Sequence, residues 1–332
     1  MPIYCGGKKI SSLYYGGKKI ASAWYGGKCV YRALTYLKTP VERWRFQASE
    51  NHSSIVAYDN GVFVGTDVGK VYKLDEENTT LWTWAGSAEQ ITAMAYKNGK
   101  LLLGDNQGNI NIVSADGKAV WSTQVAGSIG HIDMDFNDNV YATIGNKLTK
   151  VTSDKTVAWV YSVPDSVVKG TILCVAVAND GSSYIGGEQF AFKISLGGKL
   201  AWAYDTTNVA RDVRIHGNQH ALWSLSSGGP SLIVETDSDG KEVFRHQFIY
   251  GDFEIISAVD KSGDMYVAGY NLLKNESITK LDASGNVLAE IPLDNNMVRA
   301  ITVDSDYNIY WWDGNGKNPI ICIQTVELPI VP

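Results

Sequence analysis

Short runs of alternating apolar and polar residues, separated by Gly- and Asp-rich turns, fill most of this chain. Residues 62–65 (VFVG) and 70–74 (KVYKL) are two such runs, and Asp67-Val68-Gly69 lies between them. The next unit repeats the arrangement in residues 91–96, 101–104 and 109–113. Alternation with a period of two, bounded by turn residues, predicts β-strands joined in hairpins. We expect an all-β protein.

One aromatic or large apolar position recurs after a polar turn. It is occupied by Trp82, Trp121, Trp159, Trp202, Phe244 and Leu288. The intervals are 39, 38, 43, 42 and 44 residues, close to the roughly 40 to 45 residues of a four-stranded propeller blade. The repeat therefore predicts a β-propeller.

A second column of large side chains gives the number of blades. Seven consecutive units carry a residue of this column on their second strand, namely Phe63, Leu102, Tyr141, Tyr184, Trp223, Tyr266 and Tyr310. Alternation places the column on one face of each sheet, where it fills the space between neighbouring sheets. The sequence predicts seven blades.

The last unit is one strand short. Residues 297–324 contain three strand patterns, and no convincing fourth follows them. Residues 41–47 carry the missing pattern at the other end of the body, and Trp44 precedes Trp82 by the usual interval. We expect residues 41–47 to close the last blade, so that residues 41–332 form a seven-bladed β-propeller without an open edge in the ring.

The first forty residues repeat every ten. Gly6-Gly7, Gly16-Gly17 and Gly26-Gly27 recur at the same place in three units. Gly pairs accept the positive φ angles of two-residue hairpin turns, so residues 1–40 are expected to form a small β-meander. So few strands are marginal in water without a partner surface. We interpret residues 1–40 as an anchor or oligomerisation module rather than a flexible leader, with an interface of Tyr4, Tyr14, Tyr15, Trp24 and Tyr25 together with Lys8, Lys18 and Lys28.

Two resemblances follow from these repeats. The Y-x-G-G-K-x-[IV] decads resemble those of tail and adsorption proteins of bacteriophages. The unit that runs from Val62 to Asp75 and on to Leu81-Trp82 resembles the quinoprotein-like (PQQ-like) propeller repeat. Enzymes of that family that bind the quinone generally have eight blades and a metal site at the axis. Seven units without a metal signal imply that this chain carries no such cofactor.

Charge is divided unevenly along the chain. Residues 1–40 contain seven of the 29 basic residues and no acidic one, which leaves 22 basic against 35 acidic residues in the body. The lysines alternate with apolar and Gly positions instead of forming a block, so we do not expect nucleic-acid binding. No apolar run approaches the roughly 18 to 20 residues of a membrane helix. The N-terminal residues lack the apolar region of a secretory signal, and neither membrane insertion nor export by that route is expected.

Motifs for catalysis and metal binding are few. The sequence contains no phosphate-binding loop of the G-x-x-x-x-G-K-[ST] type and no G-x-S-x-G nucleophile elbow. His216 and His220 flank Gly217-Asn218-Gln219, where a shared metal requires a particular hairpin geometry and a polar turn is the alternative. Asp237-Ser238-Asp239 and Asp304-Ser305-Asp306 lie at expected turns, where Asp is usual punctuation. We predict no catalytic residue and no metal.

The best binding candidates are residues that depart from the blade pattern. Where other units place a small residue after the second strand, the last unit has Trp311-Trp312-Asp313. Alternation sends the two rings to opposite sides, so that one packs in the blade while the other offers a stacking surface for a sugar, with Asp313 or Asn315 as hydrogen-bond partner. Packing of both rings is the alternative. Tyr270 and Asn271 form a second, weaker patch.

The sequence thus points to a non-enzymatic bacteriophage virion protein, such as a tail-fibre, baseplate or receptor-binding component. Residues 1–40 are expected to bind other virion proteins or further copies of the chain, and the propeller to bind a glycan or protein of the host surface. Such a protein is made in the host cytoplasm and incorporated into the virion. The alternatives are a polysaccharide-degrading adsorption enzyme, which needs two carboxylates at the scissile bond, and a cellular protein-interaction scaffold.

Overall fold

The computed structural model describes residues 4–5, 8–9, 13–15, 18–20, 22–25, 28–32, 41–165, 171–216, 219–227, 229–248, 255–270, 276–293, 298–312 and 319–324. Every regular element in these ranges is a β-strand, as the alternating pattern predicts. Within the same ranges, no helix has the length and hydropathy of a membrane span.

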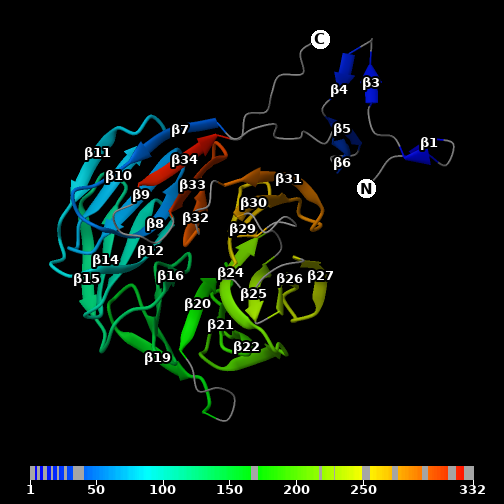
Figure 1. Ribbon diagram of the computed structural model, residues 1–332. Coiled ribbons are helices and arrows are strands. Elements are labelled where there is room, and N and C mark those ends of the chain that lie inside the picture. Colours follow the sequence, from blue (N-terminus) through cyan, green and yellow to red (C-terminus); the bar gives the residue numbers. More distant parts are fainter. Residues whose placement is uncertain are drawn as a thin grey trace.

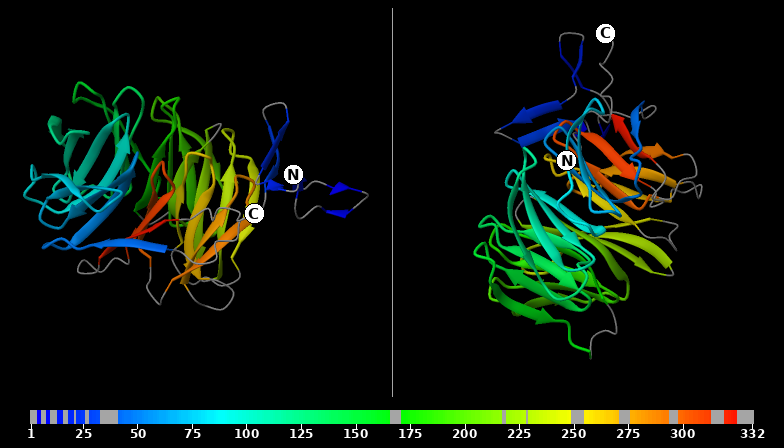
Figure 2. Two further views of the ribbon diagram at one scale, coloured as in Figure 1. Left: turned by 90° about the horizontal axis from the view of Figure 1, so that it is seen from above. Right: turned by 90° about the vertical axis from the view of Figure 1, so that its left-hand side faces the viewer.

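Seven four-stranded antiparallel sheets surround a common axis and form a seven-bladed β-propeller (Figures 1 and 2). In the first three blades the strands are β8 (His52–Tyr58), β9 (Gly61–Thr66), β10 (Val71–Asp75) and β11 (Thr80–Trp84); β12 (Ile91–Lys97), β13 (Lys100–Asp105), β14 (Asn109–Ser114) and β15 (Ala119–Gln124); and β16 (Ile132–Met134), β17 (Val140–Ile144), β18 (Lys147–Val151) and β19 (Val157–Ser162).

The remaining blades repeat this order from the axis outward. Their strands are β20 (Ile172–Val177), β21 (Ser183–Gly187), β22 (Phe190–Ile194) and β23 (Leu200–Tyr204); β24 (Val209–His216), β25 (His220–Ser227), β26 (Gly229–Thr236) and β27 (Glu242–Gln247); β28 (Ile256–Val259), β29 (Met265–Tyr270), β30 (Glu276–Leu281) and β31 (Val287–Pro292); and β32 (Ala300–Val303), β33 (Asn308–Trp312), β34 (Ile320–Gln324) and β7 (Val41–Phe46).

The seventh blade joins the two ends of the propeller. Strand β7 pairs antiparallel with β34, with Trp44 opposite Cys322 and Phe46 opposite Ile320. The Trp44 indole also donates a hydrogen bond of 2.8 Å to the carbonyl of Glu76 in the first blade. The predicted N-terminal strand closure is therefore confirmed, and it covers the edge of β34 that the chain would otherwise leave unpaired.

The apolar core lies between the blades. One cluster combines Val62, Val64 and Leu74 of the first blade with Tyr310 and Trp312 of the seventh. The seven residues of the predicted second-strand column are all fully buried. Both faces of a sheet in the ring are thus covered by neighbouring sheets, so nearly every residue of a second strand is buried whichever way it points.

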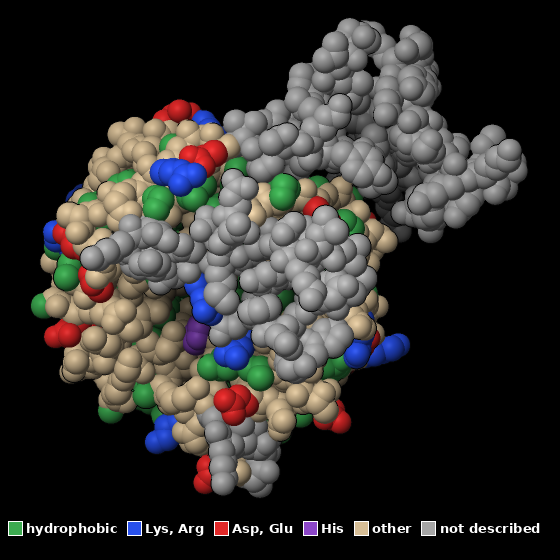
Figure 3. All heavy atoms as spheres, viewed as in Figure 1, with side chains coloured by type: hydrophobic (Ala, Val, Ile, Leu, Met, Phe, Trp, Pro, Cys, Tyr) green, Lys and Arg blue, Asp and Glu red, His purple; other side chains and the backbone are tan. Residues whose placement is uncertain are grey.

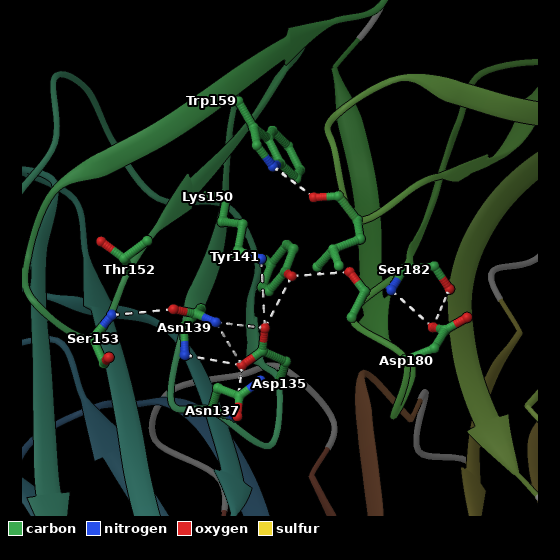
Figure 4. Close-up of polar contacts among 12 residues, drawn as sticks. Asp135, Asn137, Asn139, Tyr141, Lys150, Thr152, Ser153, Trp159, Asp180 and Ser182 are labelled. Atoms are coloured by element: carbon green, nitrogen blue, oxygen red, sulfur yellow. Dashed lines mark hydrogen bonds and ion pairs between the residues drawn. The ribbon is translucent and has the colours of Figure 1, made fainter.

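Hydrogen bonds of an aspartate and a tyrosine join neighbouring blades at their turns (Figure 4). Asp135 Oδ1 accepts hydrogen bonds of 2.9 and 3.0 Å from the backbone of Asn137 and Asn139, which holds the turn between the first two strands of the third blade. The Tyr141 hydroxyl lies 3.1 Å from Asp135 Oδ2 and 2.9 Å from the carbonyl of Gly181 in the fourth blade. Tyr266 with Asp260 and Tyr310 with Asp304 repeat the tyrosine–aspartate pair. The buried column therefore also positions the turns.

The recurrent aromatic residues make a second kind of contact between neighbouring blades. Trp159, on the outer strand of the third blade, donates a hydrogen bond of 3.0 Å to the carbonyl of Leu196 (Figure 4). Its ring lies on Gly198. Gly198 has a φ of +75°, and a Cβ built on it would come within 2.6 Å of the ring. Trp82 on Gly117, Trp202 on Gly240 and Phe244 on Gly285 repeat the contact. At these four positions, the repeat of about forty residues corresponds to an aromatic–glycine contact between successive blades.

The described strands of the N-terminal segment form three two-stranded sheets that are separate from the seven sheets of the ring (Figures 1 and 2). These are β1 (Tyr4–Cys5) with β2 (Lys8–Lys9), β3 (Leu13–Tyr15) with β4 (Lys18–Ile20), and β5 (Ser22–Tyr25) with β6 (Lys28–Arg32). Each Gly-Gly pair joins the two strands of one hairpin. Among the described strands of this segment, pairing occurs within each decad, whereas a continuous meander also pairs one decad with the next.

Two adjacent glycines allow a controlled test of the aromatic–glycine contact. We expect Gly198→Ala to lower the free energy of unfolding by about 2 kcal/mol, because alanine is strained at positive φ and its Cβ clashes with the Trp159 ring. Gly197→Ala is the control, since a Cβ there meets no atom within 4 Å, and it should change stability by less than about 0.5 kcal/mol. Chemical denaturation measures both. Equal effects of the two substitutions would mean that the contact does not hold the blades together.

Candidate functional site

The two tryptophans of the seventh blade both pack in the ring. Trp311 belongs to a cluster with Tyr266 and Ile278 of the sixth blade, and Trp312 to a cluster with Val62 and other residues of the first blade. The rings point to opposite faces of β33, as alternation predicts, yet they are only 5% and 7% exposed. The sequence argument for a sugar-stacking tryptophan assumed that one face of β33 is open, whereas closure of the propeller covers both faces. The structure supports the packing alternative.

The strands that precede the other predicted binding residues end on one face of the ring. Tyr270 is the last residue of β29, and Asp313 directly follows β33. These are the second strands of neighbouring blades, so the loops that leave them emerge on the same face. Asn271, Asp313 and Asn315 and the side chain of Tyr270 lie outside the described residues. The topology therefore brings the two patches to one face without placing their side chains.

The anchor residues have a described backbone only. Tyr4 pairs with Lys9, Tyr14 with Lys19 and Tyr25 with Lys28 across the three hairpins. The side chains of the predicted interface, Tyr4, Tyr14, Tyr15, Trp24, Tyr25, Lys8, Lys18 and Lys28, lie outside the described residues. Their role as a partner interface stays a prediction.

A cavity of about 330 Å³ lies on the axis of the propeller and is lined by the first strands of all seven blades. Its wall is mostly apolar, with residues such as Val56, Val175 and Val213. Lys97, Asp133 and Arg214 are the charged residues of the lining. On the face shown in Figure 3, Lys or Arg side chains flank a histidine near the centre. Sequence periodicity marks the strands that line the axis, but it does not show which of their side chains meet there.

Side-chain oxygens cap the inner edges of several first strands. Asp133 Oδ2 accepts a hydrogen bond of 2.6 Å from the backbone N–H of Val177 in the next blade. Thr302 Oγ1 accepts one of 2.9 Å from Ala57, across the point where the ring closes. Because the first strand of each blade has no strand beside it at the axis, such acceptors satisfy N–H groups that face the channel. Burial raises the pKa of Asp133 above its ordinary value, although Lys97 and the Val177 hydrogen bond oppose this.

His216 and His220 pair across the hairpin of the fifth blade and share one carboxylate. His220 Nδ1 is hydrogen bonded to Glu235 Oε1, and His216 Nε2 lies 3.5 Å from Glu235 Oε2. Burial raises the pKa of Glu235, but the two histidines outweigh it and hold the pKa below its usual range. Glu235 comes from the adjacent strand β26, and no spacing rule in the sequence marks it.

This cluster does not form a metal centre in the structure. Across the described ranges, no three His, Cys, Asp or Glu side chains are arranged to hold a metal ion. The aspartates of the two Asp-Ser-Asp segments hold turns, as expected from the sequence. Asp237 Oδ1 accepts hydrogen bonds from the backbone of Asp239 and Lys241, and Asp304 Oδ1 does the same for Asp306 and Asn308.

Comparison with known proteins supports the propeller assignment. A family model described as outer membrane protein assembly factor BamB, of the PQQ type, matches residues 37–132. This match and the seven-bladed ring support a PQQ-like propeller body. The sequence matches none of the curated proteins.

Solved propellers of low sequence identity share the fold. The β-propeller domain of Cps50 (Swd1) from Myceliophteria thermophila has a TM-score of 0.69 and 11% identity, and the match covers 85% of this chain and 99% of that one. The WD40 β-propeller domain of Doa1 has a TM-score of 0.68 and 12% identity, covering 87% of this chain and 97% of that one. At such identities the likeness concerns architecture alone.

The burial of Trp312 predicts a large effect on stability. Trp312→Ala should lower the free energy of unfolding by about 3 to 5 kcal/mol, because it empties a packed site between two blades. Phe136→Ala is the control, since Phe136 is 58% exposed and should cost less than about 0.5 kcal/mol. Urea denaturation measures both. A small loss for Trp312→Ala would restore the tryptophan as a ligand-stacking candidate.

The raised pKa of Asp133 predicts how its substitution depends on pH. Because the folded pKa lies above the ordinary value of 3.8, wild-type stability falls as pH rises through the folded pKa and Asp133 ionises. Asp133→Asn cannot ionise, so its unfolding free energy relative to wild type should increase from pH 3 to pH 7. Denaturation series at several pH values measure this difference. A difference that stays constant or decreases over that range would contradict a raised pKa.

Proposed function

We propose that this protein is a non-enzymatic binding platform of a bacteriophage virion, in which the propeller carries the ligand-binding face and residues 1–40 anchor it to other virion proteins. The proposal is supported by the observation that the strands of the N-terminal segment and those of the propeller belong to different sheets. Residues 41–324 supply all four strands of every blade, and β1 to β6 belong to none of the seven sheets. The N-terminal hairpins are therefore available for another surface.

The hairpins also have a physical need for such a surface. A two-stranded hairpin is marginally stable in water on its own, and the described strands of each decad form a two-stranded sheet. Burial of the aromatic residues of the decads against a partner would supply the missing apolar contacts. The seven basic residues of this segment favour an acidic partner. The acidic body of a second copy is one such surface, which makes homo-oligomerisation compatible with the same anchor.

The virion location rests on the resemblance of the decads to phage tail and adsorption proteins. In that setting the propeller would be part of a tail fibre, a baseplate or a receptor-binding complex. The loop face after β29 and β33 would meet a host-surface glycan or protein through Tyr270, Asn271, Asp313 and Asn315. A polysaccharide-degrading enzyme would differ in one outcome, because it would release new reducing ends from host envelope polysaccharide.

Two truncations separate the anchor from the ring. A chain of residues 41–332 should keep the thermal transition of the full protein but lose self-association or binding to the virion partner. A chain of residues 48–332 is the control, because it lacks β7, leaves β34 unpaired and should unfold at a lower temperature. Calorimetry and light scattering measure both properties. The anchor hypothesis fails if the full chain and residues 41–332 have the same mass and the same partners.

A further inference from the structure

The carboxylates around the axial cavity have their oxygens occupied by the protein. Asp133 accepts hydrogen bonds of 2.6 Å from Val177 N–H and 2.7 Å from Met134 N–H, one on each oxygen. Asp212, one residue before the lining residue Val213, accepts bonds from the backbone of Val213 and Ser257 and from the Ser257 hydroxyl. These acceptors serve the inner edges of the blades. Both carboxylates are thus hydrogen bonded to the protein.

The cations of the cavity, in contrast, keep unused donors. Arg214 Nε donates to Asp212 Oδ2 at 3.1 Å and to the Ser257 carbonyl at 3.2 Å. Neither Nη of Arg214 has a hydrogen-bond partner among the described residues. Lys97 Nζ donates one hydrogen bond, of 2.8 Å, to the carbonyl of Val177, and an ammonium group carries three donors. The cavity therefore presents N–H groups to whatever occupies it.

The two cations approach one side of the cavity although they come from different blades. Lys97 belongs to the second blade and reaches Val177 in the fourth, on β20. Arg214 on β24 and Val177 on β20 occupy equivalent positions in their blades. Each directly follows the residue that pairs with the column residue of its blade, which is Trp223 for Arg214 and Tyr184 for Val177. Both cations interact electrostatically with Asp133. All three residues line the same cavity.

The volume and the charges of the cavity limit the class of ligand that it can bind. A volume of about 330 Å³ is at the lower end of the range for small-molecule sites. Valine and isoleucine side chains form much of the wall, including Val259 and Ile301, which suits an apolar body. The positive charges of Lys97 and Arg214 are balanced by the negative charges of Asp133 and Asp212, so a bound dianion would leave twice the uncompensated negative charge that a single carboxylate leaves.

We propose that the axial cavity binds a small organic monocarboxylate, with its carboxylate on Arg214 and Lys97 and its apolar body against the valine wall. A guanidinium with both Nη groups available matches the two oxygens of a carboxylate. This site is separate from the N-terminal anchor and from the loop face. The proposal does not depend on the virion function.

Titration of the full-length protein with three small probes tests the ligand class. Benzoate should bind saturably, one molecule per chain, in isothermal titration calorimetry. Inorganic phosphate, a dianion near neutral pH, should bind more weakly, and benzylammonium, the cationic counterpart of benzoate, should not bind. The proposal is overturned if benzoate shows no saturation at millimolar concentration, or if benzylammonium or phosphate binds as tightly as benzoate.

Four variants test the site. Arg214→Gln and Lys97→Gln should each raise the benzoate Kd by about tenfold, the usual worth of a charged hydrogen bond. Asp133→Asn should lower the Kd, because it removes a negative charge beside the anion. Arg245→Gln is the matched control, since Arg245 pairs with Glu242 on the outer strand β27, and it should leave the Kd unchanged.

A loss of binding in these variants can be distinguished from a loss of folding. Circular dichroism identifies any that is unfolded, and the opposite sign expected for Asp133→Asn cannot come from a loss of structure. An unchanged Kd in both cation variants, or a weaker one in Asp133→Asn, would remove the carboxylate site from the cavity. Neither result bears on the truncations that test the anchor, so the two proposals can fail separately.

Discussion

The pairing of β7 with β34 is the contact on which the rest of the structure depends. It joins chain segments nearly three hundred residues apart and turns a row of sheets into a ring. In the ring, both faces of each blade are covered by neighbours, and the aromatic–glycine contacts and the tyrosine–aspartate turns can repeat from blade to blade. Without the closing strand, the seventh blade would expose the edge of β34.

Ring closure also places the innermost strand of every blade around the central axis. The innermost strand of each blade has no hydrogen-bonding strand beside it, so acceptors such as Asp133 and Thr302 cap N–H groups of the following blade. Lys97 and Arg214 compensate part of the charge of Asp133. The polar groups of the cavity are thus a consequence of ring architecture. The donors left over on the two cations give that architecture a capacity for binding anions.

The binding candidates show how far local patterns reach. Alternation correctly sends Trp311 and Trp312 to opposite faces of β33, because side-chain direction on a strand is a local property. Whether a face is open is not local, and closure buries both rings. The same limit applies to the histidine pair, since the hairpin brings His216 opposite His220 but only the neighbouring strand brings Glu235 between them.

The sequence by itself determined the all-β class, the seven repeats, the closing strand and the Gly-Gly hairpins, because period, alternation and turn chemistry act over a few residues. Those features need no knowledge of what lies across the ring. Only the tertiary structure decided that Lys97, Asp133 and Arg214, from three different blades, share one cavity. It also decided that the described strands of each decad pair with each other. The physical reason is that these outcomes depend on contacts between segments far apart in the chain, and no local residue pattern encodes those distances.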